Sequence, residues 1–263
     1  IEAFSAKEAI MMSSGTPALI LKTTDAGESW KVVYRNDDKA YFLDAMDFAG
    51  AKTGYVLGDP IGPNFLLLQT ADHGNNWKVM PNLPPAIPGE AAFAASGTCL
   101  RIIKKRGNPV IVTGGSTARI LLGVKSKELI KKWLVENLPI TQGEASKGAF
   151  SVANSGNHMI IVGGDYQQNK KTDSTNCNYD AISKSNHYKI AGNIPSGFQS
   201  CIEYLDKDKF LSTGTSGTNI SADGGETWKQ IDAISFNVCR KAKHGKLVLL
   251  AGDKGKIAKF IND

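Results

Sequence analysis

The sequence predicts an all-β protein, specifically a β-propeller of four-stranded antiparallel blades, and three observations lead to this prediction. A short Asp-Gly-Trp motif recurs along the chain, and an apolar strand ending in a small-residue turn recurs once in each repeat. The 27 glycines among 263 residues suit many short strands and tight turns. Repeats of roughly 45 residues that each hold four strands are typical of propeller blades.

The motif reads Ser/Thr-x-Asp-x-Gly-x-Ser/Thr/Asn-Trp, and each copy follows an apolar run and precedes a lysine, as a turn between two strands does. An Asp in such a turn accepts hydrogen bonds from nearby backbone N–H groups, a Gly adopts positive φ, and a Trp packs over the hairpin. We therefore interpret the motif residues as structural: Asp25, Gly27, Trp30, Asp72, Gly74, Trp77, Asp223, Gly225 and Trp228.

Two degenerate units fill the long interval between Asp72 and Asp223, with Trp133 and Tyr188 at the aromatic position. An Asn-Leu/Ile-Pro tail follows three of the aromatic positions and supports this register: Asn82–Pro84, Asn137–Pro139 and Asn193–Pro195. Residues 126–134 also show helical spacing of apolar side chains. The register of Trp133 and its tail favours a strand there instead.

Six units result, within one domain spanning 1–263: 1–37, 41–84, 91–139, 147–195, 197–232 and 235–263. Each unit is expected to hold an inner strand near an aromatic residue, a second apolar strand, a third strand, and a strand beginning at the Trp. The aromatic residues of the inner strands are Phe48, Phe93, Phe150, Phe198 and Phe236.

Composition excludes several classes of protein. With 41% hydrophobic and 21% charged residues the chain can build a core. Its apolar runs are far shorter than the ~20 residues of a membrane-spanning helix, so no transmembrane segment is expected. The net charge of +6 comes from scattered lysines and does not indicate nucleic-acid binding. The four cysteines lack zinc or redox spacing, which leaves disulfides and buried thiols both open.

Several further stretches carry a family resemblance: Gly58-Asp59-Pro60, Gly89–Thr98 (GEAAFAASGT), Val162–Tyr166 and Ser221–Trp228. Together with the repeats they resemble the Asp-box (BNR) propellers, and among these the bacterial relatives of the photosystem II stability/assembly factor of plants and cyanobacteria. The resemblance implies a seven-bladed propeller that is exported to the periplasm or outside the cell and binds a protein partner. A membrane complex is one candidate partner.

Compared with that family, residues 1–263 lack one N-terminal blade, the closing fourth strand of the last unit, and a signal peptide. We expect the natural polypeptide to begin upstream of Ile1, or this blade to be missing. We further expect a monomer that uses no cofactor.

Candidate ligand-binding residues come from the loops after the second strands, which open on one face of a propeller. Asp59, Asp165 and Asp253 each follow the Gly that ends such a strand, and Glu90 and Tyr166 are expected to join them at the channel mouth. This set could form a polar or cation-binding site. The alternative is ordinary turn chemistry, because Asp after Gly is common in turns. No metal is assigned.

These features favour a non-catalytic binding or scaffold protein over an enzyme, with a protein or a small ligand bound on the channel-mouth face. No catalytic residue is assigned. The alternatives are a sialidase-like glycoside hydrolase, because sialidases use Asp-box propellers, and an oxidoreductase, as some relatives are labelled. A sialidase needs an arginine cluster, and the chain has five scattered arginines. The polar segment Asp165–Tyr179 is either a mobile partner-recognition loop over the binding face or a tolerated insertion.

Overall fold

The computed structural model describes residues 1–103, 107–126, 129–156, 158–180, 188–190, 192, 194 and 196–261. The chain divides into two compact units. The first comprises Ile1–Ile111 with Leu121–Val135, and the second comprises Val112–Ile120 with Glu136–Asp263. Asn193 and Pro195 of the third predicted tail, and the last two residues of the sixth predicted unit, lie outside the described residues.

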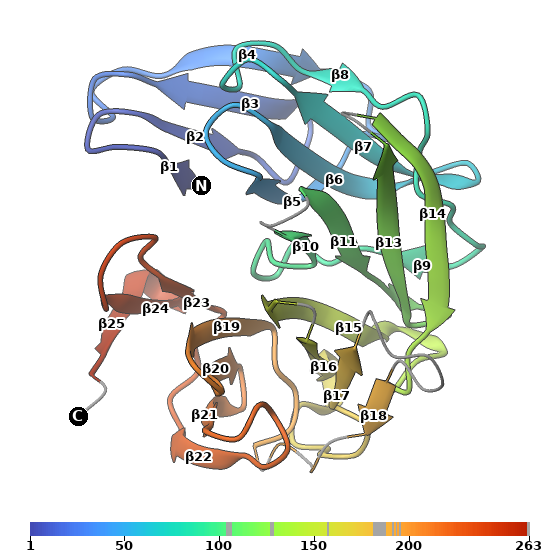
Figure 1. Ribbon diagram of the computed structural model, residues 1–263, viewed down its shortest axis with the longest axis vertical. Helices are drawn as coiled ribbons and strands as arrows, with labels where there is room; N and C mark the ends of the chain where they lie inside the picture. Colours follow the sequence, from blue (N-terminus) through green and yellow to red (C-terminus); the bar gives the residue numbers. More distant parts are fainter. Residues whose placement is uncertain are drawn as a thin grey trace. The chain divides into compact units, whose positions relative to one another are not determined.

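Three antiparallel sheets follow one another in the first half of the chain, with each strand hydrogen-bonded to the next (Figure 1). Their strands are β1 (Glu2–Ala3), β2 (Ala9–Met12), β3 (Ala18–Thr23) and β4 (Lys31–Asn36); β5 (Leu43–Phe48), β6 (Gly54–Ile61), β7 (Asn64–Thr70) and β8 (Lys78–Val79); and β10 (Leu100–Ile103), β11 (Asn108–Val112), β13 (Arg119–Ser126) and β14 (Leu129–Asn137). The two-residue strand β9 (Glu90–Ala91) precedes the third sheet.

The second half of the chain continues the pattern (Figure 1). Its strands are β15 (Glu144–Ser155), β16 (His158–Asp165), β17 (Asn176–Asp180) and β18 (Tyr188–Ile190), with β12 (Gly114–Gly115) paired to β15; β19 (Cys201–Asp206), β20 (Lys209–Gly214), β21 (Gly217–Ser221) and β22 (Lys229–Asp232); and β23 (Val238–Lys241), β24 (Val248–Gly252) and β25 (Lys256–Phe260). The described helical residues form two 3₁₀ turns, η1 (Tyr166–Gln168) and η2 (Asp253–Gly255).

The predicted fold class is confirmed: the chain is all-β and consists of successive antiparallel propeller blades. One inner strand differs from the prediction. Phe93 lies in a connection, and the inner strand of the third blade is β10, which begins at Leu100. The sequence Ala91–Ala95 is rich in alanine and lacks the alternation of large apolar side chains that a half-buried strand shows, whereas Leu100–Ile103 has it.

The four tryptophans all lie at the start of, or within, the fourth strand of a blade. Trp30, Trp77 and Trp228 immediately precede β4, β8 and β22, and Trp133 lies inside β14. The described part of residues 126–134 is therefore extended rather than helical, and Lys127 and Glu128 lie outside the described residues. The Asn82–Pro84 tail also has a structural role, because the Trp133 indole N–H donates to the carbonyl of Asn82 at 3.2 Å.

Each Asp-box turn is closed by the same hydrogen bonds. In the second blade the Thr70 hydroxyl donates to Asp72 Oδ1 at 2.9 Å and accepts from Gly74 N at 3.0 Å. Asp72 Oδ1 also accepts from Asn76 N at 3.0 Å. The hairpins at Asp25 and Asp223 repeat these contacts within 0.2 Å. A hydroxyl and a carboxylate thus satisfy the backbone donors of a turn that is too tight to satisfy them by itself.

These hairpins also join one blade to the blade before it. A Cβ at Gly74 would lie 2.1 Å from Ile10 Cδ1, and a Cβ at Gly225 would lie 2.4 Å from Ile160 Cδ1. Polar side chains of the preceding blade reach the same turns: Lys22 Nζ donates to His73 O at 2.8 Å, and His158 Nε2 lies 3.0 Å from Gly224 O. Glycine is therefore required both by its positive φ and by the close approach of the neighbouring blade.

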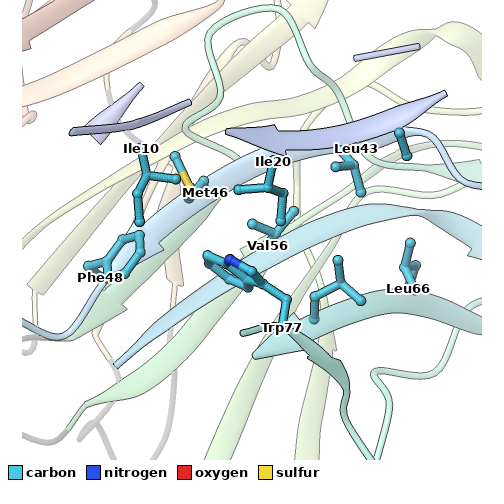
Figure 2. Packing of buried hydrophobic residues seen from close by; sticks show 10 residues of the cluster. Ile10, Ile20, Leu43, Met46, Phe48, Val56, Leu66 and Trp77 are labelled. Carbon is cyan, nitrogen blue, oxygen red and sulfur yellow. The ribbon is translucent and has the colours of Figure 1, made fainter. Parts of the chain in front are cut away.

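The hydrophobic core lies between consecutive blades. Figure 2 shows Ile10 and Ile20 of the first blade packed against side chains of the second. Within this cluster the rings of Phe48 and Trp77 meet edge to face at 5.9 Å. Trp228 occupies the corresponding place in the second compact unit, where it packs with residues of the fourth and fifth blades: Ala153, Ile160, Val162, Ile202 and Phe210.

We expect Trp228→Ala to lower the free energy of unfolding by ~3 to 5 kcal/mol, because Trp228 is only 9% exposed and its removal leaves a large cavity. Urea denaturation measures this loss. The half-buried Trp30 provides the control, since Trp30→Ala should cost less. A loss below about 1 kcal/mol for Trp228→Ala would show that this side chain is not packed as described.

We expect the stability of the protein to fall as the pH drops from about 4 to about 2. Hydrogen bonds from Asn76 lower the pKa of Asp72 to about 2, and those from Ser29 lower the pKa of Asp25 to about 2. Since the folded-state pKa values lie below the usual value of 3.8, the stabilisation is present above pH 4 and is lost as pH falls through the folded pKa. Denaturation at several pH values should show that the free energy of unfolding of Asp72→Asn falls less than that of wild type as the pH drops. The exposed Asp173 lies outside the hairpins, and Asp173→Asn should retain the wild-type slope.

Candidate functional site

Of the three predicted channel-mouth aspartates, two lie in the second compact unit. Asp165 ends β16 and caps η1, because its Oδ1 accepts from Gln167 N at 2.9 Å. It is buried, and its Oδ2 has no hydrogen-bond partner. Asp253 is exposed and accepts from Asn237 Nδ2 at 2.7 Å. Both carboxylates therefore have a role in their own turns.

Tyr166 belongs to an aromatic cluster at the same turn. Its ring meets Phe150 edge to face at 6.3 Å and Phe198 at 6.5 Å, while Phe150 and Phe198 meet at 4.8 Å. Phe150 and Phe198 are buried, but Tyr166 remains 47% exposed. The fold thus holds one accessible aromatic ring on a rigid apolar base.

The polar segment Asp165–Tyr179 contains two short elements of regular structure. It begins with η1, and Asn176–Asp180 forms β17. Asn169 O accepts from Phe198 N at 2.9 Å, Asn169 Nδ2 donates to Thr215 Oγ1 at 3.2 Å, and Lys170 Nζ donates to Ser216 O at 3.3 Å. These bonds connect the segment to the fifth blade beside Tyr166.

In the first compact unit the structure places Asp59 next to the segment that carries Glu90. Asp59 Oδ1 accepts from Ala92 N at 3.3 Å, two residues beyond Glu90. Glu90 is buried, and its Oε2 accepts from Ile87 N at 3.0 Å, which closes the local turn. Glu90 therefore shapes the loop that covers Asp59.

Asp44 is the residue of this site that the sequence interpretation missed. Its side chain is 1% exposed, and neither carboxylate oxygen has a hydrogen-bond partner in the part of the chain that the structure describes. Burial raises the pKa of Asp44 well above its usual range, and the charge of Asp59 raises it further. Burial also raises the pKa of Asp59, while the hydrogen bond from Ala92 opposes this change. The two aspartates form a coupled acidic pair.

Two β-bulges create the pair. The register between β5 and β6 passes from Leu43–Gly58 directly to Ala45–Leu57, so Asp44 is the extra residue. The register between β6 and β7 likewise skips Asp59. A bulge re-aims the side chain of its extra residue. A carboxylate inside the apolar stretch Leu43–Met46 was the available sequence signal, but the bulge that buries it depends on the pairing of distant residues.

The described residues contain no group of three or more His, Cys, Asp or Glu side chains suited to a metal ion. All four cysteines are buried and free, which settles the disulfide alternative in favour of thiols. Cys99 lies beside the acidic pair, and its pKa is raised first by burial and then by the charge of Asp44. No helix in the described part of the chain is long and apolar enough to cross a membrane.

Comparison with known proteins agrees with the Asp-box assignment. Residues 3–105 match the family described as photosynthesis system II assembly factor YCF48. The structure of YCF48 from Cyanidioschyzon merolae is similar at 16% identity, with a TM-score of 0.50 over 99% of this chain and 93% of that one. A structure described as YCF48 bound to D1 peptide has 16% identity and a TM-score of 0.48, covering 100% of this chain and 92% of that one. No curated protein matches the sequence. The family match covers residues 3–105, and the likeness to the structure from Cyanidioschyzon merolae shows a shared propeller fold.

We expect Asp44→Asn to change the pH dependence of stability. Burial raises the folded-state pKa of Asp44 above 3.8. The contribution of this side chain to the free energy of unfolding is therefore fully present below about pH 4 and is lost as the pH rises through the folded pKa. The variant should therefore gain stability relative to wild type between pH 4 and pH 8. Urea denaturation in the presence of a chelator measures the difference, and Asp253→Asn serves as an exposed control. Parallel wild-type and Asp44→Asn curves would contradict the burial of a carboxylate at this position.

Proposed function

We propose that this Asp-box propeller, which resembles the photosystem II assembly factor, is a non-catalytic module that binds a protein segment around Tyr166. The description of the matched family as an assembly factor supports a protein partner, because an assembly factor acts by binding the components that it helps to assemble. A membrane complex remains the candidate source of that partner. The proposal requires a surface on this chain that suits a peptide.

Tyr166 is the single observation that carries the proposal. Tyrosine gives a large contact area at low conformational-entropy cost, and accessible aromatic side chains are enriched among residues that dominate binding energy. The edge-to-face contacts with Phe150 and Phe198 hold the ring in place before a partner arrives. Amide and ammonium groups of Asn169 and Lys170 lie on the same connection and can complete a polar rim.

The glycoside hydrolase alternative is less well supported by the geometry. Such enzymes need two carboxylates that flank a sugar, but the acidic pair includes Asp44, which is 1% exposed and cannot reach a substrate. Two of the described arginines are already paired: Arg35 with Asp37 at 2.7 Å and Arg240 with Glu203 at 3.7 Å. These arginines do not form the carboxylate clamp of a sialidase.

We expect Tyr166→Ala to weaken partner binding by at least ~10-fold, as loss of a central aromatic contact does. The matched control is Tyr188→Ala, because Tyr188 is also exposed, at 39%, and belongs to the same compact unit. Two probes are used. The first probe is the D1 peptide named in the description of one YCF48 structure, and its binding is measured by fluorescence anisotropy. The second probe is a mixture of membrane proteins from the source organism, and their binding is measured in a pull-down.

The expected result is retention of the same partner by wild type and Tyr188→Ala and its loss by Tyr166→Ala, with equal thermal stability for all three proteins. Equal retention by both variants would show that the binding surface lies elsewhere. Binding of neither probe by wild type would contradict the proposed function itself.

A further inference from the structure

The acidic pair of Asp44 and Asp59 has a cover that the proposed function does not use. The cover is the segment Gly89–Thr98, the alanine-rich stretch that the sequence analysis singled out. Its Ala92 N–H donates to Asp59 Oδ1 at 3.3 Å, and a Cβ at Gly97 would lie 3.8 Å from the carbonyl oxygen of Asp44. Cys99, directly after the segment, is fully buried beside both carboxylates. The segment therefore lies against both aspartates.

The fold itself does not require a carboxylate at this bulge. The corresponding bulge of the fourth blade occurs where the register between β15 and β16 passes from Ala149 to Ser151 and skips Phe150. Phe150 is a buried apolar side chain with aromatic neighbours. An apolar residue thus satisfies the same backbone geometry, so the packing of the blade does not account for the carboxylate of Asp44.

Among the described residues, no positive charge acts on Asp44 to balance the charge of the pair. Both oxygens of Asp44 are buried and accept no hydrogen bond from those residues, and Asp59 accepts one from the backbone N–H of Ala92. The neighbouring charge that acts on Asp44 is the carboxylate of Asp59, which is repulsive. Burying an uncompensated carboxylate costs several kcal/mol, so a site of this kind either keeps a proton or takes up a cation.

The geometry points to a cation site: we propose that Asp44 and Asp59 bind a hard divalent cation of the Ca²⁺ class. Asp59 is half-buried, whereas Asp44 is fully buried. Both carboxylate oxygens of Asp44 accept no hydrogen bond from the described residues, and oxygen is the ligand that Ca²⁺ prefers. Two carboxylates neutralise a divalent charge.

The chemistry of the neighbours narrows the class of ion. Burial disfavours the thiolate of Cys99, and a protonated thiol is a poor ligand for Zn²⁺ or other soft metals. Since the described residues supply two acidic ligands to this site, backbone carbonyls and water must complete the coordination. Such a low count of charged ligands predicts a weak site, with a dissociation constant of about 10⁻⁴ to 10⁻³ M.

The test compares thermal unfolding at about pH 7.5 in a chelator and in about 10 mM Ca²⁺. We expect the Tm of wild type to be roughly 3 to 6 °C higher in Ca²⁺ than in the chelator. Asp44→Asn and Asp59→Asn should abolish the rise. Asp253→Asn is the matched control, because Asp253 also follows a Gly after a second strand but is exposed and paired with Asn237. This control should keep the full response. Equilibrium dialysis with radioactive Ca²⁺ gives the stoichiometry, which should be one ion per chain.

Three outcomes would overturn the proposal: no Ca²⁺-dependent rise in wild type, an equal rise in Asp44→Asn, or loss of the rise in Asp253→Asn. If wild type shows no Ca²⁺-dependent rise and Asp44→Asn has a higher Tm than wild type in the chelator, Asp44 is a protonated buried carboxyl instead of a cation ligand. If Asp44→Asn does not fold, Asp59→Asn decides the question, because its side chain is half-buried. Binding of the peptide probes at Tyr166 is a separate readout, so failure of the cation site leaves the proposed function intact.

Discussion

The closure of the Asp-box hairpin is the interaction on which the rest of the structure depends. A turn between two strands leaves backbone N–H groups without partners, and the Ser/Thr hydroxyl and Asp carboxylate supply them in a fixed geometry. That geometry places a glycine where the second-strand isoleucine of the preceding blade can approach it closely. The same hairpin therefore completes its own blade and provides a contact surface for its neighbour.

Packing between blades follows from this arrangement. In the second and fifth blades the Trp after the hairpin packs against the preceding blade, Trp77 beside Ile10 and Trp228 beside Ile160. A four-stranded sheet has too little core by itself, so apolar side chains on its faces are satisfied only by the next blade. Hydrogen bonds from Lys22 and His158 to the hairpins of the following blades also stabilise the contact between neighbouring blades.

The opposite ends of the blades differ more from one another than the hairpin ends do. There the regular pairing is interrupted by bulges, and the side chains of the extra residues differ from blade to blade: a buried carboxylate at Asp44, a phenylalanine at Phe150. Phe150 provides the base for the accessible ring of Tyr166, and Asp44 forms an acidic pair with Asp59. One backbone feature thus yields an aromatic surface in one compact unit and an acidic site in the other. The hairpin ends stay nearly constant because their hydrogen bonds tolerate few side chains.

The fold class, the register of the blades and the role of the Asp-box residues were predictable from the sequence, because they depend on local chemistry. A Ser or Thr, an Asp and a Gly within five positions form the same turn in all three copies of the motif. The inner strand of the third blade begins at Leu100 rather than near Phe93, because the alanine-rich stretch around Phe93 lacks the alternating large apolar side chains of Leu100–Ile103. The burial of Asp44 beside Asp59, the roles of Asp165 and Asp253 in their own turns, and the contact of Tyr166 with two phenylalanines are visible in the tertiary structure alone. These contacts join residues far apart in the chain through bulges and strand pairing, and no spacing within a single segment specifies them.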